Sequence, residues 1–155
     1  MGATMIWKNE AYVIDTDPKN LDVDVIHGFL GASYWAKDIP RSVVEKSIRH
    51  SLCFGIYHET KQIGFARVIT DYATFAYLAD VFVVASHRGK GLSKWLMGCI
   101  QSHPELQNLR RWMLATLDAH GLYKQFGFNV TAKPERLMEI VDMDIYSKIA
   151  KGNRL

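Results

Sequence analysis

The feature that most constrains the fold of this chain is a glycine-containing loop between a strand-like segment and a helix-like segment. Residues 75–84 are rich in aromatic and β-branched side chains, which is typical of a strand. The loop of residues 87–93, with the sequence HRGKGLS, follows it. From Leu92 to Ile100, apolar residues then recur at i, i+3, i+4, i+7 and i+8, the spacing of an amphipathic helix. With a further strand at residues 112–116, this pattern predicts a strand–helix–strand crossover whose two strands lie parallel.

The rest of the chain predicts elements that can complete one sheet. We expect further strands at residues 10–15, 52–57, 63–69 and 137–141. The polar residues 58–62 indicate a hairpin. One helix is expected to begin at Asn20 and end near Gly31, and a second runs from Pro40 to Ser51. The order predicts an α/β (α+β mixed) fold, and 155 residues suit a single domain over residues 1–155.

The loop has the properties of a phosphate-binding site. Glycines let the backbone turn tightly and approach a ligand closely. The start of the following helix offers unpaired N–H groups and a partial positive charge. Arg88, Lys90 and Lys94 add full charges, so the loop suits a polyphosphate. The alternative is an ordinary glycine turn with solvated basic residues. The dinucleotide and Walker spacings both fail, because Lys94 occupies the third glycine position and the Gly-Lys-Ser/Thr ending is missing.

The charge and the cysteines exclude several other classes. The formal charge of +3, from 19 basic and 16 acidic residues, does not indicate a nucleic-acid partner. Cys53 and Cys99 lie in apolar patterns and are expected to be buried, reduced thiols, and no spacing predicts a metal site. No secretory signal opens the sequence, and the longest apolar run, residues 75–85, is too short to span a membrane. We therefore expect no membrane partner and, by default, a cytoplasmic location.

Two segments resemble conserved motifs of the GNAT N-acetyltransferases. The first resembles motif A of that family, [RQ]-x-x-G-x-[GA], with Arg88, Gly91 and Ser93 at the three fixed positions. Serine replaces the usual Gly or Ala, but it is small and its hydroxyl can donate to a phosphate. The second, residues 121–128, resembles the Leu-Tyr-x-x-x-Gly-Phe signature at the expected distance downstream. The resemblance implies a GNAT-like central mixed, mostly antiparallel sheet flanked by helices.

The resemblance also implies the cosubstrate and its contacts. Family members bind acetyl-coenzyme A (acetyl-CoA), with the pyrophosphate on the motif A loop, and need no metal. The pantetheine arm pairs with the end of the preceding strand, which separates there from its neighbour. Many relatives place an asparagine near the start of the next helix; here Asp118 stands there, with a plain N-cap as the alternative. The implied cofactor-binding residues are Phe82, Val83, Val84, Arg88, Gly89, Lys90, Gly91, Leu92, Ser93, Asp118 and Tyr123.

Two residues are candidates for proton transfer. Tyr123 resembles the family tyrosine that protonates the departing thiolate, and a phenol, with an ordinary pKa of about 10, carries a proton at neutral pH. The alternative for Tyr123 is a packing role beside Leu122 and Phe126. Asp80 interrupts an apolar strand and matches the acidic base that many members carry there. A structural carboxylate that pairs with a neighbouring loop is the alternative for Asp80.

The acceptor is expected to be a primary amine that attacks the thioester directly in a ternary complex. Members of the family build the acceptor site from the first two helices and nearby loops. Here these regions offer the aromatic residues Tyr34, Trp35, Tyr72 and Tyr77, which suit a small molecule or peptide with an amino group. Some members dimerise, so a homodimer is one possible assembly, and the sequence leaves the oligomeric state open.

Two other functions compete with this interpretation. A non-catalytic acyl-CoA-binding module would keep the loop but make no use of Tyr123 or Asp80. A nucleic-acid-binding domain would use scattered basic residues together with Trp95 and Trp112, although Trp95 falls on the apolar face of its helix.

Overall fold

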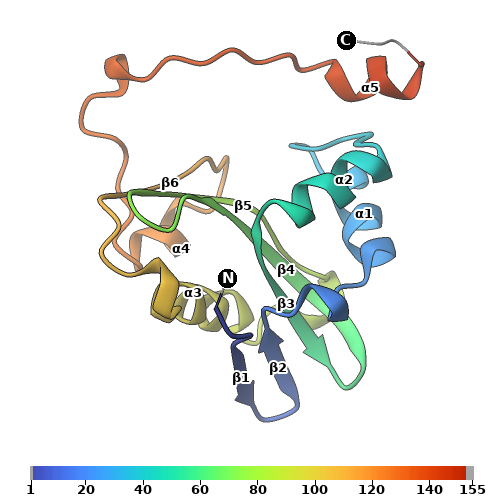
Figure 1. The fold of residues 1–155 in the computed structure, drawn as a ribbon, viewed down its shortest axis with the longest axis vertical. Helices are drawn as coiled ribbons and strands as arrows, with labels where there is room; N and C mark the ends of the chain where they lie inside the picture. The colour runs from blue at the N-terminus through green and yellow to red at the C-terminus, as the bar shows by residue number, and fades with distance from the viewer. Residues whose placement is uncertain (1, 153–155) are drawn as a thin grey trace.

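One six-stranded sheet organises the computed structural model, which describes residues 2–152 (Figure 1). Its strands follow chain order: β1 (Ile6–Asn9), β2 (Tyr12–Asp15), β3 (Leu52–His58), β4 (Lys61–Thr70), β5 (Phe75–Val83) and β6 (Arg111–Leu114). Neighbouring strands are antiparallel except β5 and β6, which are parallel. This confirms the predicted mixed, mostly antiparallel sheet, the β3–β4 hairpin and the parallel crossover.

Helices cover both faces of the sheet. The main helices are α1 (Val23–Ala32), α2 (Arg41–Arg49) and α3 (Leu92–Ser102), followed by the short α4 (His120–Lys124) and α5 (Ile145–Ala150). Helix α3 buries Leu96, Met97 and Ile100 in one apolar cluster with the sheet. On the other face, Ile26 and Leu30 of α1 are buried with residues of α2 and the sheet in a second cluster. The sheet is therefore the middle of three layers.

Several predicted boundaries were wrong for local reasons. Helix α1 is capped by Asp22, whose side chain accepts from the N–H groups of Asp24 and Val25, whereas the Asn20 amide donates to Asp15. The end of that helix at Ala32, next to Gly31, agrees with the prediction. The chain also has an additional first strand, β1, which pairs with β2 and was not predicted.

The end of the chain departs furthest from the sequence prediction. Residues 137–141, predicted as a last strand, form no strand in the structure. They belong to an extended segment that runs from the α4 side of the molecule to α5 beyond the α1–α2 side (Figure 1). Cys53 and Cys99 are both 4% exposed and free, which confirms the prediction of buried thiols. Within residues 2–152, no helix has the length and apolar character needed to span a bilayer.

Candidate functional site

A cleft opens where β5 and β6 separate. The two strands pair from Phe75 with Arg111 to Leu78 with Leu114, and among the described residues this pairing goes no further. Strand β5 nevertheless continues to Val83, paired only with β4, while β6 ends at Leu114. The predicted strand over residues 112–116 was therefore too long at its end. The separation leaves an open cleft of about 740 Å³ between the two strands.

Predicted site residues from five parts of the chain line this cleft. They are Tyr34, Trp35, Tyr77, Asp80, Phe82, Val83, Arg88, Ser93, Asp118 and Tyr123. The lining is completed by residues that the sequence prediction had missed: Phe29, three further residues of β5 and the end of β6 (Leu78, Ala79, Val81 and Leu114), Leu122, and, after β6, Ala115, Thr116, Leu117 and Ala119. No pattern in the sequence identified the residues after β6, because they are small or apolar and their position depends on where β6 ends.

A second hollow of about 220 Å³ adjoins the cleft at the glycine loop, sharing Val83, Arg88, Ser93 and Leu122 with it. Gly89, Gly91 and Leu92 line this hollow. The backbone φ angles of Gly89 and Gly91 are +77° and +74°, in the left-handed region that favours glycine. Gly91 is the N-cap of α3 and offers no side chain to its first N–H groups.

The loop presents free backbone donors. Within residues 2–152, none of the N–H groups of residues 89–94 donates a hydrogen bond to the protein; the first helical bond runs from Trp95 N–H to the Gly91 carbonyl. The Arg88 Nε donates to the Val83 carbonyl over 2.9 Å, which ties the loop to the end of β5. The guanidinium keeps its remaining N–H groups for another partner. Loop and helix together therefore offer several donors and a positive charge to an anion.

Three predicted site residues lie outside both hollows. The Val84 N–H already donates to the Ile63 carbonyl over 2.9 Å. The Lys90 ammonium lies 6.0 Å from the ring centre of Tyr12. Tyr72 sits at the turn between β4 and β5, where it packs against the α3-side core rather than in the cleft.

Asp80 is held by two donors at a bulge in β5. Its φ angle is +55°, and the pairing of β4 with β5 shifts register there. One carboxylate oxygen accepts from the Trp35 Nε1 over 3.0 Å and the other from the Arg67 Nε over 2.9 Å. The Arg67 and Asp80 side chains are 16% and 10% exposed. Arg67 was not predicted, although a charged residue inside an apolar strand is the same signal that identified Asp80.

Tyr123 lies in α4 at the opposite wall of the cleft. Its side chain is 9% exposed, and its ring packs edge-on against Phe128 with 6.0 Å between the centroids. Burial raises the pKa of the phenol above its ordinary value, and the nearby Tyr34 and Asp118 add to the rise. The predicted cap by Asp118 was wrong: Ala119 is the N-cap, with its N–H bonded to the Thr116 hydroxyl, so Asp118 lies free to line the cleft.

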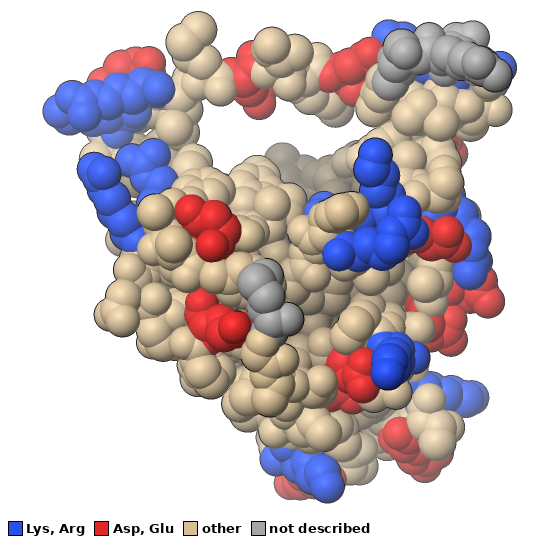
Figure 2. Space-filling model, viewed as in Figure 1, with Lys and Arg blue, Asp and Glu red and all other residues tan. Residues whose placement is uncertain are grey.

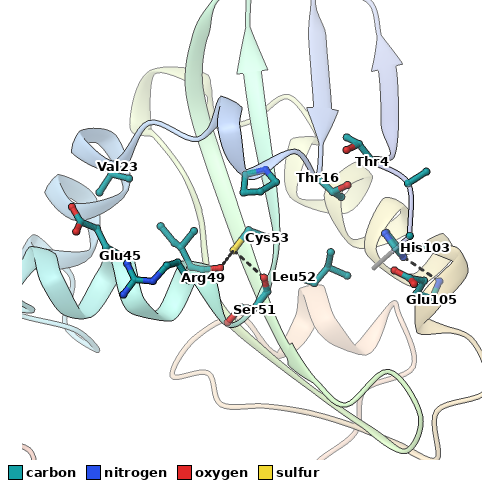
Figure 3. Close-up of a pocket in the computed structure, with 14 residues that line it drawn as sticks. Thr4, Thr16, Val23, Glu45, Arg49, Ser51, Leu52, Cys53, His103 and Glu105 are labelled. Atoms are coloured by element: carbon teal, nitrogen blue, oxygen red, sulfur yellow. Dashed lines mark hydrogen bonds between the residues drawn. The ribbon is translucent and has the colours of Figure 1, made fainter.

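Another hollow, of about 640 Å³, lies near the N-terminus (Figure 3). The Cys53 sulfur there is 3.8 Å from each of the Ile48 and Ser51 carbonyl oxygens, and burial raises the pKa of this thiol to about 12. The thiol is thus protonated at neutral pH and unsuited to nucleophilic attack. None of the predicted site residues lines this hollow. Among the described residues, no group of three or more His, Cys, Asp or Glu side chains could hold a metal ion.

Comparisons with known proteins agree with this geometry. The family model described as "Acetyltransferase (GNAT) domain" matches residues 49–130. A protein of Gibberella zeae named as a putative acetyltransferase is 34% identical, over 84% of each chain.

Solved structures extend the similarity to the fold. The structure of a Xanthomonas campestris pv. campestris protein, described as belonging to the GNAT family, is 52% identical, with a TM-score of 0.86 over 88% of this chain and 96% of the other. A Clostridium acetobutylicum structure, described as a predicted acetyltransferase with acetyl-CoA, shares only 13% identity. It has a TM-score of 0.61 over 84% of this chain and 94% of the other, so it shows the fold alone.

Proposed function

The chain belongs to the GNAT acetyltransferase family and is an acyltransferase, and we propose that it moves an acetyl group from acetyl-CoA to a primary amine within a ternary complex. The observation that carries this proposal is the separation of β5 from β6 after Leu78 and Leu114. It opens a cleft that reaches the aromatic residues of the α1–α2 connection and adjoins the hollow at the loop, where the free donors lie. A long, flexible molecule with a phosphate end and a reactive end fits such a cleft.

The loop is the proposed anchor for the pyrophosphate. The N–H groups of residues 89–94 and the Arg88 guanidinium would share its negative charge, with the Ser93 hydroxyl as a further donor. Phosphate groups held at a helix N-terminus also interact favourably with the helix dipole. The Lys90 and Val84 side chains lie outside both hollows, so the proposal assigns no direct contact with the cosubstrate to either side chain.

The free edge of β5 is the proposed support for the acetyl-bearing arm. From residue 79 to residue 83 this edge lacks a strand partner among the described residues, so its backbone groups can pair with amide groups of a ligand. When bound, acetyl-CoA supplies the acetyl group as an activated thioester. A backbone N–H of this edge would stabilise the negative charge that develops on the carbonyl oxygen. Holding acetyl-CoA and the amine side by side in one cleft means that the two need not meet by diffusion in the reactive orientation.

Proton transfer is assigned to the two walls of the cleft. As the C–N bond forms and the C–S bond breaks, Asp80 accepts the proton lost by the amine, directly or through water. Tyr123 gives its phenolic proton to the departing thiolate. Each Asp80 oxygen accepts one hydrogen bond in the structure and keeps a second lone pair for this purpose. Phe29, Tyr34, Trp35 and Tyr77 would form an aromatic acceptor pocket beside Asp80.

A turnover assay tests the reaction. Purified protein is mixed with acetyl-CoA and a panel of primary amines, and the free thiol released is followed with a chromogenic disulfide reagent. The two native cysteines are each 4% exposed and should react slowly with that reagent. We expect thiol release that depends on the amine, with aromatic amines favoured over aliphatic polyamines. Release at the same rate with and without every amine tested would contradict the proposal.

The role of Asp80 can be separated from its ion pair. We expect Asp80→Asn to lower kcat/KM by about 10²- to 10⁴-fold, the usual contribution of a general base. Arg67→Ala is the matched control, because it breaks the same ion pair but leaves the carboxylate. Steady-state kinetics measured on all three proteins decide between the roles. If Arg67→Ala loses as much kcat/KM as Asp80→Asn, Asp80 is structural.

A further inference from the structure

Four titratable side chains form a cluster beside the glycine loop and outside the cleft. They are Tyr12 of β2, His58 at the end of β3, His87 directly before the loop, and Lys90 within the loop. Tyr12 and His58 are partners in the β2–β3 pairing, with 5.0 Å between their ring centroids. The centroid of the His87 ring lies 5.1 Å from that of His58 and 5.7 Å from that of Tyr12. The Lys90 ammonium lies 6.0 Å from the Tyr12 centroid. The reaction proposed above uses none of these four side chains.

His87 belongs both to this cluster and to the lining of the hollow at the loop. It lines that hollow together with Arg88 and Lys94. Its Nδ1 atom lies 2.8 Å from the Tyr12 hydroxyl oxygen, and this hydrogen bond fixes the ring from the side of the sheet. When a neutral imidazole accepts the Tyr12 hydroxyl proton at Nδ1, its own hydrogen stands on Nε2. Within residues 2–152, Nε2 forms no hydrogen bond with the protein, so this donor remains available to a ligand.

The charge of His87 depends on whether an anion is present. In the ligand-free protein, burial lowers the pKa of His87 below its ordinary 6.5, and repulsion from His58 and Lys90 lowers it further. A bound anion acts in the opposite direction, because a nearby negative charge favours the protonated imidazole. The bond with Tyr12 does not oppose this protonation: an imidazolium donates from Nδ1 to the Tyr12 oxygen and keeps Nε2 as a donor to the ligand.

The other charged groups around His87 are cationic. They are His58 (when protonated) and Lys90 in the cluster, and Arg88 and Lys94 in the lining of the hollow. None of the residues that line this hollow is Asp or Glu. Charges of both signs are mixed elsewhere: in Figure 2, most Lys and Arg groups on the visible face have Asp or Glu beside them. The loop therefore combines cationic groups without a compensating carboxylate, which suits an anion.

We propose that His87, oriented by Tyr12, is a further contact residue for the pyrophosphate of the cosubstrate, and that it takes up a proton from solvent when this anion binds. This inference rests on the proposed function, which supplies acetyl-CoA as the anion. Binding and protonation then favour each other to the same extent. Because the pKa of His87 is higher in the complex than in the free protein, the affinity for the anion increases as the pH falls. The increase begins at the pKa of the complex and is complete below that of the free protein, which lies under 6.5.

Calorimetric titration with 3′-dephospho-CoA tests this coupling. CoA itself carries a phosphate monoester that titrates at a pH of about 6, whereas the pyrophosphate diester of the dephospho form keeps a constant charge from about pH 5.5 to 8. We expect wild-type protein to bind this ligand about tenfold more tightly at the acid end of that range, as a pKa rise of about 1 requires. His87→Gln should bind with an affinity that does not change with pH. His50→Gln is the matched control, since His50 is exposed at the end of α2, and it should behave as wild type.

Proton NMR of the imidazole rings measures the pKa of His87 in the wild-type protein, without a substitution. This pKa should rise by about 1 when 3′-dephospho-CoA is saturating. In the ligand-free protein, His58→Gln should raise the pKa of His87, because it removes a neighbouring repulsion. Equal affinity at every pH, or a His87 pKa that the ligand leaves unchanged, overturns the role of His87 while the cosubstrate stands. Absence of binding at every pH contradicts the proposed function itself, and the role of His87 is then wrong as well.

Discussion

Replacing Tyr123 by phenylalanine should lower kcat by about 10²- to 10⁴-fold, the usual contribution of a positioned proton donor, while the affinity for acetyl-CoA changes little. The substitution removes one oxygen atom from a ring that keeps its contact with Phe128. Within residues 2–152, the Tyr123 hydroxyl forms no hydrogen bond with the protein, so no buried partner loses its bond. The loss should therefore appear in the chemical step and leave the folded structure unchanged.

The pH dependence follows from the same group. The protonated phenol is the donor, and its pKa is raised by burial, so the donor form is complete at neutral pH. The proton is lost only as the pH rises through a value above the ordinary pKa of about 10. Activity that depends on Tyr123 should consequently fall on the alkaline side and not on the acid side. Steady-state kinetics over a pH series, with wild type and Tyr123→Phe side by side, measures this.

Tyr57→Phe is the matched control for this variant. Tyr57 is 8% exposed in β3, lies outside the cleft lining, and has a buried hydroxyl without a hydrogen-bond partner among the described residues. Removing that hydroxyl should leave kcat unchanged and the free energy of unfolding equal or slightly higher. If both variants keep wild-type kcat, Tyr123 is not the proton donor. If both lose it, the effect reflects packing and not proton transfer.

The second large effect is expected at Arg88. Arg88→Ala should weaken acetyl-CoA binding by about 10- to 100-fold, since hydrogen bonds to charged groups contribute about 1.5–3 kcal/mol. The variant also loses the bond from the Arg88 Nε to the Val83 carbonyl, which ties the loop to the end of β5. Titration calorimetry of acetyl-CoA into wild-type and variant protein measures the change directly.

Arg49→Ala provides the matched control for the calorimetry. Arg49 is an exposed arginine at the end of α2 that lines the hollow beside Cys53 and not the cleft. Its loss should leave the affinity within experimental error. If Arg88→Ala binds as tightly as wild type while Arg49→Ala binds weakly, the ligand lies in the other hollow and the assignment of the cleft is wrong. If wild-type protein binds no acetyl-CoA, the proposed cosubstrate is wrong.

Local patterns were sufficient for much of the fold. Helix α3 and the β3–β4 hairpin were predicted from apolar spacing and turn residues, because each is specified by side chains close together in the sequence. The glycine loop was recognised for the same reason: left-handed backbone at Gly89 and Gly91 and the free N–H groups before α3 follow from a short run of residues. The predicted positions of Arg88 and Ser93 therefore fall at the start of the cleft.

The interpretation of single residues depended on neighbours distant in the chain. Asp80 was recognisable as an odd carboxylate in an apolar strand, but its two partners, Trp35 and Arg67, lie 45 and 13 residues away. Asp118 looked like a helix cap, and the structure instead uses Ala119 and Thr116 at that position. Tyr72 shared the aromatic character of Tyr77 but faces the core on the α3 side. Residue type alone could not distinguish these surroundings.

The sequence by itself determined the loop, the amphipathic helix after it and the strands on either side, because hydrogen bonding and apolar periodicity act over a few residues. Only the tertiary structure decided where β5 leaves β6, which side chains meet in the cleft, and that residues 137–141 stand unpaired as an arm. A strand-like sequence indicates that a segment is able to pair with another strand. Pairing also requires the edge of a sheet close to that segment. That edge is set by the path of the whole chain, which carries this segment away from β6.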